Sequence, residues 1–168
     1  LADDFDIDED LYYPILPTAT QYARNAIFAG LMPLQIKQMY PYLWVDEEED
    51  EGKNLNEQAL IAHQLERFRR REQFTYHKLN DSQAVSQLLT QIKQFAATPL
   101  NVLVINFIDI LSHARTESRM VRELAGSEGA YRGITQSWFK HTPIRQLFRQ
   151  LAELDYDLII TTDHGSIK

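Results

Sequence analysis

Two apolar runs in the chain are each followed by an aspartate and a histidine. The run at residues 101–109 ends on Asp109, with His113 four residues later, and the run at residues 156–162 leads into Asp163 and His164. Carboxylate oxygen and imidazole nitrogen are ligands for zinc or manganese in a chain without cysteine. Ligands gather at the carboxyl ends of parallel strands, so two such pairs at one sheet edge would suit a dinuclear metal site.

Thr20 is the candidate nucleophile. The sequence TQYARNAIFA predicts a helix over residues 20–29, with Thr20 as its N-cap and Gly30 just beyond its end. Free N–H groups and the helix dipole at such a start favour a phosphate, and a bound metal would deprotonate the hydroxyl. Arg24 lies one turn further on the same face and can fork onto phosphate oxygens. The alternative is that Thr20 only caps the helix and that the strand-end residues only form turns.

The elements that position these residues follow from hydrophobic periodicity. Continuous apolar runs predict two buried strands, and their alternation with helices predicts an α/β fold with a mostly parallel sheet and helices on both faces. The predicted helices cover about residues 54–71, 82–97 and 142–154, and the strands cover residues 101–109 and 156–162. Arg67, Arg69, Arg70 and Arg71 place positive charge at the end of the first of these helices.

The bulk properties narrow the classes of protein. A length of 168 residues predicts one domain, and a net charge of −7 argues against broad nonspecific binding to nucleic acid. Bound divalent cations would still supply local positive charge for a phosphodiester. No apolar run is long enough to span a bilayer, and the absence of cysteine favours a cytoplasmic location.

Three motifs together resemble the alkaline phosphatase superfamily, and in finer detail its PglZ branch. LPTATQYARNAIFAGLMP (Leu16–Pro33) is similar to the segment that carries the nucleophile. Asp109-Ile-Leu-Ser-His113 is similar to a D-x-x-x-H metal motif, and Thr161-Thr162-Asp163-His164-Gly165 to a T-[ST]-D-H-G motif. The order and spacing of the motifs agree with the family over nearly the whole chain.

The resemblance implies an alkaline phosphatase-like fold and a metal-dependent phosphodiesterase. It implies two zinc ions, with manganese as an alternative. Thr20, Asp163 and His164 would bind one ion while Thr20 attacks phosphorus, and Asp109 and His113 would bind the other. The implied substrates are phosphodiesters such as cyclic or linear oligonucleotides.

The family pattern also needs an aspartate on an earlier strand and a histidine after the D-H-G motif. The acids from Asp3 to Asp10 lie in a non-strand context, and no residue follows Lys168. We therefore expect residues 1–168 to be the central part of such a domain, inactive or weakly active by itself.

The resemblance also implies a parent protein that is a two-component response regulator linked to control of type IX secretion, with a regulatory protein partner and no membrane insertion. The oligomeric state stays open, a dimer included. Two other readings remain: a regulatory protein-binding module on the same fold, and a structural α/β domain without catalysis.

Overall fold

The computed structural model describes residues 4–45, 55–154 and 156–165, and the chain divides into two compact units. Unit 1 comprises Leu1–Ile7 and Gln73–Asp157, and unit 2 comprises Asp8–Glu72 and Leu158–Lys168. Unit 2 is therefore discontinuous in sequence, because most of unit 1 is inserted between its two pieces.

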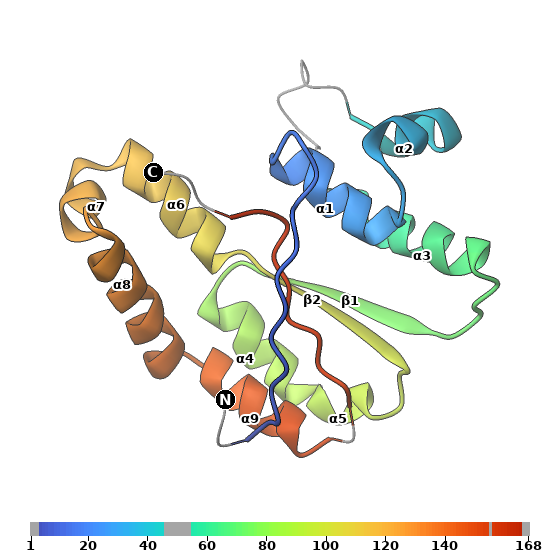
Figure 1. Ribbon diagram of the computed structural model, residues 1–168. Helices are drawn as coiled ribbons and strands as arrows, with labels where there is room; N and C mark the ends of the chain where they lie inside the picture. Colours follow the sequence, from blue (N-terminus) through green and yellow to red (C-terminus); the bar gives the residue numbers. More distant parts are fainter. Residues whose placement is uncertain (1–3, 46–54, 155, 166–168) are drawn as a thin grey trace. The chain divides into compact units, whose positions relative to one another are not determined.

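Unit 1 contains a parallel two-stranded sheet (Figure 1). Strand β1 (Phe74–Leu79) pairs with β2 (Leu100–Ile105) in a register that places Phe74 opposite Leu100 and Leu79 opposite Ile105. The connection between the strands carries helices, as a parallel crossover requires. The predicted α/β class with parallel strands is confirmed, although β1 itself was not among the predicted strands.

Helices surround this sheet in sequence and supply most of its core. The helices of unit 1 are α4 (Ser82–Thr90), α5 (Ile92–Phe95), α6 (Phe107–Glu117), α7 (Arg119–Leu124), α8 (Glu128–His141) and α9 (Ile144–Ala152). The buried core residues are Leu79, Val85, Leu88, Phe95, Ile144, Leu147, Phe148 and Leu151. They come from β1, α4, α5 and α9, and their i, i+3, i+4 spacing on α4 and α9 gives each helix one apolar face.

Two predicted elements of unit 1 have different bounds in the structure. The helix predicted over residues 82–97 begins as expected after Asp81, whose carboxylate accepts from the Ala84 backbone N–H at 2.8 Å, but Gln91 separates it into α4 and α5. The strand predicted over residues 101–109 ends at Ile105, because helix α6 begins at Phe107. An apolar run signals burial in either element, so it does not by itself locate the change from strand to helix.

Unit 2 contains helices α1 (Thr20–Ala29), α2 (Pro33–Met39) and α3 (Glu57–Arg67) and the short 3₁₀ helix η1 (Pro41–Leu43). Its buried apolar core consists of Ala29, Ile36, Leu43 and Leu60. Helix α1 has the predicted bounds and ends on Gly30, which takes the left-handed conformation (φ 58°) and donates to the Ala26 carbonyl at 2.8 Å. This is the C-terminal geometry for which glycine is favoured.

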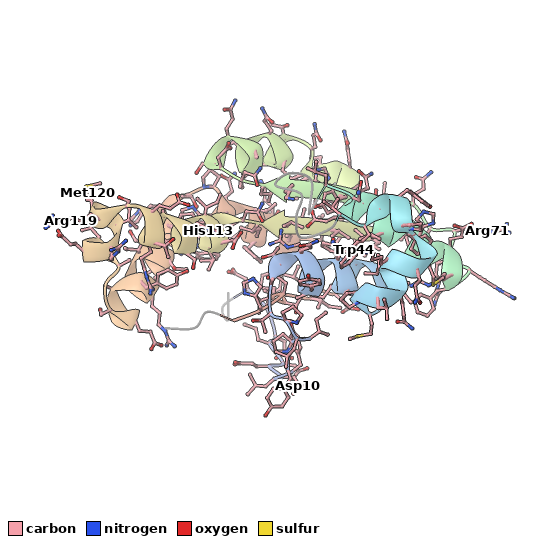
Figure 2. The ribbon with its side chains drawn as sticks, turned by 90° about the horizontal axis from the view of Figure 1, so that it is seen from above. Asp10, Trp44, Arg71, His113, Arg119 and Met120 are labelled. Atoms are coloured by element: carbon pink, nitrogen blue, oxygen red, sulfur yellow. The ribbon has the colours of Figure 1, made fainter. Side chains whose placement is uncertain are left out.

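Helix α3 ends four residues earlier than predicted. It stops at Arg67, and Arg69 has a positive φ of 55°, so the chain has left the helix before the last two arginines. Figure 2 shows the side chain of Arg71 pointing away from the ribbon into solvent. The arginine cluster is therefore mainly a solvated segment after the helix rather than part of its last turn.

The second predicted strand, residues 156–162, is wrong for the described part of the chain. Residues 156–162 are extended without forming a strand. The side chains of Ile159 and Ile160 are 87% and 65% exposed, respectively. An apolar run states how much surface a segment gains by burial, but a strand also needs a neighbouring strand with which its backbone can pair.

Candidate active site

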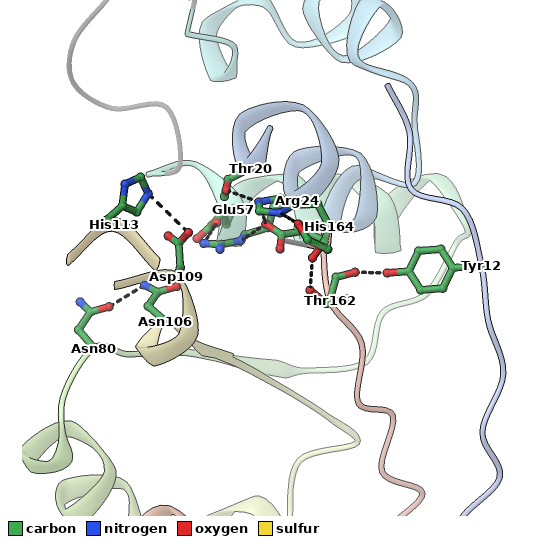
Figure 3. Close-up of polar contacts among 12 residues, drawn as sticks. Tyr12, Thr20, Arg24, Glu57, Asn80, Asn106, Asp109, His113, Thr162 and His164 are labelled. Atoms are coloured by element: carbon green, nitrogen blue, oxygen red, sulfur yellow. Dashed lines mark hydrogen bonds and ion pairs between the residues drawn. The ribbon is translucent and has the colours of Figure 1, made fainter. Parts of the chain in front are cut away.

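Thr20 is the first residue of helix α1, not its N-cap. The N-cap is Ala19, whose extended backbone (φ −88°, ψ 143°) precedes the helix, and no side chain caps it. The Thr20 hydroxyl instead lies 3.0 Å from Nε2 of His164 (Figure 3). The capping interpretation of Thr20 therefore fails, and the hydroxyl is free of the helix backbone for another role.

The tautomer of His164 follows from its second nitrogen. Nδ1 lies 2.9 Å from the Gly165 carbonyl oxygen, which can only accept a hydrogen bond. In the neutral imidazole the proton is thus on Nδ1, and the lone pair of Nε2 faces the Thr20 hydroxyl. A carbonyl on the far nitrogen is also the usual way in which a metal-binding histidine is oriented.

The turn that carries Asp163 and His164 is held by hydroxyl groups. Thr162 Oγ1 donates to the His164 carbonyl at 2.8 Å. Tyr12, from the N-terminal piece of unit 2, lies 3.0 Å from Thr161 Oγ1 through its phenol oxygen and also donates to the Thr162 carbonyl. Figure 1 shows the two extended segments running side by side. The D-H-G turn is thus fixed from both directions.

Arg24 lies one turn after Thr20 and contacts two carboxylates. Its Nε donates to Asp163 Oδ2 at 3.2 Å, and its Nη1 lies 3.5 Å from Glu57 Oε1 (Figure 3). The side chains of Arg24 and Asp163 are 12% and 15% exposed, whereas Glu57 is 1% exposed. The predicted phosphate-binding cation is therefore already engaged by acidic side chains.

Glu57 is the site residue that sequence reasoning missed. It is the first residue of α3, next to Asn56, whose side-chain amide donates to the Leu43 carbonyl at 3.1 Å. An acid in the first turn of a helix is normally a solvent-exposed partner of the helix dipole, so the sequence carried no signal of its burial. Only the packing of α1 against α3 turns it into an internal carboxylate.

Asp109 and His113 lie in unit 1, on helix α6 rather than at the end of a strand. They are four residues apart on one helix face, with Asp109 Oδ1 3.6 Å from His113 Nε2. The two side chains are 36% and 70% exposed. Just before them, Asn106 Nδ2 donates to Asn80 Oδ1 at 2.7 Å and so links the carboxyl ends of β2 and β1. The pair thus follows the expected sheet edge by one helical turn.

The donor atoms of Thr20, Asp163 and His164 fit a divalent cation. Ligands about 2.0–2.2 Å from a tetrahedral zinc lie about 3.3–3.6 Å from one another. The observed separations, 3.0 Å from Thr20 Oγ1 to His164 Nε2 and 4.0 Å from that nitrogen to Asp163 Oδ2, bracket this value. Within the described ranges no group of three or more His, Cys, Asp or Glu residues is placed to hold a metal, because the third donor here is a hydroxyl.

A hydroxyl at a helix start beside an Asp-His turn, in a chain with a parallel sheet, defines an alkaline phosphatase-like domain. The chain belongs to the PglZ family, since the model of the BREX system PglZ alkaline phosphatase-like domain matches residues 2–168. Proteins of this superfamily are generally metal-dependent, and the family indicates a hydrolase of phosphate esters. No curated protein matches the chain. Among the described residues, no helix has the length and apolar character needed to cross a membrane.

Proposed function

We propose that this chain carries the nucleophile site of a zinc- or manganese-dependent phosphodiesterase, with Thr20 as the nucleophile. The observation that carries the proposal is the 3.0 Å approach of the Thr20 hydroxyl to His164 Nε2, between residues 144 positions apart in sequence. A contact of this kind brings a hydroxyl, an imidazole and a carboxylate together where a helix begins. That is the set of groups a phosphoryl-transfer site requires.

The chain's own residues divide the chemistry. The Thr20 oxygen would attack phosphorus, forming a threonyl phosphoester as the bond from phosphorus to the leaving alcohol breaks. In the metal-free protein, His164 Nε2 accepts the hydroxyl hydrogen bond and is the atom to which the proton passes. Arg24 is placed one turn away to stabilise charge on the phosphoryl oxygens. Water then attacks phosphorus and releases Thr20.

A bound divalent cation would lower the pKa of the attacking hydroxyl and neutralise charge on the phosphoryl group. Thr20 Oγ1, the Asp163 carboxylate and His164 Nε2 are the residues that would hold it. Asp109 and His113 are the proposed ligands of a second ion. Their carboxylate and imidazole suit the same metals, and both side chains are accessible on α6.

The substrate and the setting follow from the sequence resemblance. We propose phosphodiester substrates, cyclic or linear oligonucleotides among them, and a cytoplasmic parent protein. In detail the motifs resemble those of PorX, a response regulator with a PglZ-type domain that is associated with type IX secretion. By that resemblance the parent is a two-component regulator whose output includes a regulatory protein partner.

Hydrolysis of bis(p-nitrophenyl) phosphate tests the nucleophile. The purified protein is assayed with zinc and with manganese, and Thr20→Ala is expected to lose the metal-dependent turnover. Thr90→Ala is the matched control, because the Thr90 hydroxyl is exposed and donates to the Gln87 carbonyl of its own helix at 2.7 Å. Turnover in Thr20→Ala equal to that of Thr90→Ala would refute the assignment of Thr20.

A protein-binding module is the second candidate, and exposed apolar side chains favour it. Leu11, Tyr13 and Leu16 are 89%, 99% and 82% exposed on one extended segment of unit 2, and Ile159 is 87% exposed on the segment beside it. Large exposed apolar side chains that cluster in this way are typical of interaction surfaces. A regulatory effect that persists in Thr20→Ala with Asp163→Ala would favour this candidate over catalysis.

A further inference from the structure

The most buried ionisable side chain in the described part of unit 2 is Glu57, at 1% exposure. A carboxylate removed from water to this extent is costly unless a cation or hydrogen-bond donors compensate it. Arg24 supplies such a cation, through Nη1 at 3.5 Å. The same guanidinium reaches Asp163 through Nε at 3.2 Å, so one cation serves two acids.

The two acids differ in what else can reach them. Asp163 adjoins His164 and the Thr20 hydroxyl, with its Oδ2 4.0 Å from His164 Nε2, and is one of the three residues that fit a divalent cation. Glu57 lies on the far side of the guanidinium, on α3, and is not one of these donors. The Nε–H of Arg24 is directed at Asp163 Oδ2, the oxygen that faces His164 Nε2.

A guanidinium and a divalent cation repel each other, so they compete for the same carboxylate. The repulsion is strong in a poorly solvated site, since Coulomb energies rise as the effective dielectric constant falls. Entry of a metal at Asp163 therefore requires the Arg24 Nε–H to leave that oxygen. The guanidinium has somewhere to stay, because Glu57 already holds its other side and has no competing metal donors beside it.

We propose that Arg24 exchanges partners within this network and that Glu57 is its positioning residue. In the metal-free protein Arg24 bridges Glu57 and Asp163. When a cation takes Asp163, Glu57 retains the guanidinium on the α1 face beside Thr20, with Nε–H released for a phosphoryl oxygen. This inference rests on the proposed function for the identity of the metal donors, and it assigns to Glu57 a role in metal affinity that passes through Arg24.

A double-mutant cycle on metal binding tests the exchange. Binding of Zn²⁺ alone and of Mn²⁺ alone is measured by isothermal titration calorimetry for the wild type, Glu57→Gln, Arg24→Gln and the double variant, with thermal unfolding as a check of folding. Glu57→Gln is expected to weaken metal binding about tenfold, because Arg24 is then left with Asp163 alone. In the Arg24→Gln background the same change is expected to have an effect of about twofold or less.

The cycle separates this role from simple charge attraction. If Glu57 acted on the metal only through space, its removal would weaken binding equally in both backgrounds, and that result would overturn the proposal, as would the absence of metal binding in all four proteins. Glu57→Asp is the conservative variant in case Glu57→Gln does not fold. Its shorter side chain withdraws the carboxylate from Arg24, so about threefold weaker binding is expected, and unchanged affinity would overturn the proposal.

The readout needs no turnover, so its failure is distinct from failure of the nucleophile assignment. Activity that survives in Thr20→Ala removes Thr20 as the nucleophile while leaving the coupling between Glu57 and Arg24 intact. Conversely, an additive cycle removes the exchange while leaving the hydrolysis result unchanged.

Discussion

Arg24→Lys is the sharpest structural test of the buried network. Arg24 uses two different nitrogens, Nη1 toward Glu57 at 3.5 Å and Nε toward Asp163 at 3.2 Å. Lysine keeps the positive charge but has a single compact ammonium group, which cannot reproduce the fork of a guanidinium. The variant therefore keeps one of the two carboxylate contacts and loses the other.

The size of the effect follows from that one lost contact. A hydrogen bond to a charged group contributes about 1.5–3 kcal/mol to stability. Both contacts are longer than the optimum and Asp163 is 15% exposed, so the lower end, about 1.5–2 kcal/mol, is expected. For a chain of 168 residues this corresponds to a fall in Tm of about 3–8 °C.

The assay is thermal unfolding followed by circular dichroism, with Arg119→Lys as the matched control. Arg119 also forms an arginine–carboxylate pair, with Glu123 at 3.3 Å, but the side chains are 92% and 70% exposed. Exposed pairs of this kind contribute little, so the control should unfold within about 1 °C of the wild type. If Arg24→Lys shifts Tm no more than Arg119→Lys does, the reasoning about burial is refuted.

Two further predictions concern stability. Gly30→Ala should destabilise the protein by about 1–2 kcal/mol, because φ is 58° and the new Cβ would lie 2.5 Å from Gln64 Nε2, whereas Gly133→Ala, in open space within α8, should stabilise it by about 0.5–1 kcal/mol. Chemical denaturation measures both, and shifts of the same sign would contradict the geometry. Burial lowers the pKa of His77 below 6.5. The unfolded chain therefore binds the proton more readily, and stability should fall as the pH drops below about 6.5, by at most about 1.4 kcal/mol per pH unit, a slope that His77→Gln should remove in urea titrations at pH 5.5 and 7.5.

Local signals in the sequence located the elements whose ends are chemically marked. Helix α1 matched its prediction because Gly30 fixes where it stops, and α4 began as expected because Asp81 caps it. Strand β1 was not predicted, since its side chains (FTYHKL) alternate without a continuous apolar run. Residues 156–162 had such a run and form no strand in the described chain, because pairing depends on neighbours that no local pattern encodes.

The candidate site divides in the same way. Motif spacing placed Thr20 with Asp163 and His164, and the structure brings these three together within unit 2. Asp109 and His113 were expected as strand-end residues, but they lie on the first turns of α6. Glu57 carried no signal at all, because its burial depends on how α1 packs on α3, and its charge partner is 33 residues away.

The insertion of unit 1 within unit 2 sets an order of assembly during synthesis. Arg24 and Glu57 are 33 residues apart, whereas 144 residues separate Thr20 from His164. At about 5–20 residues per second, the second interval takes about 7–29 s to translate. The guanidinium therefore meets Glu57 on the ribosome well before Asp163 exists, and the buried acid is neutralised early while the reactive hydroxyl waits for the last-made turn.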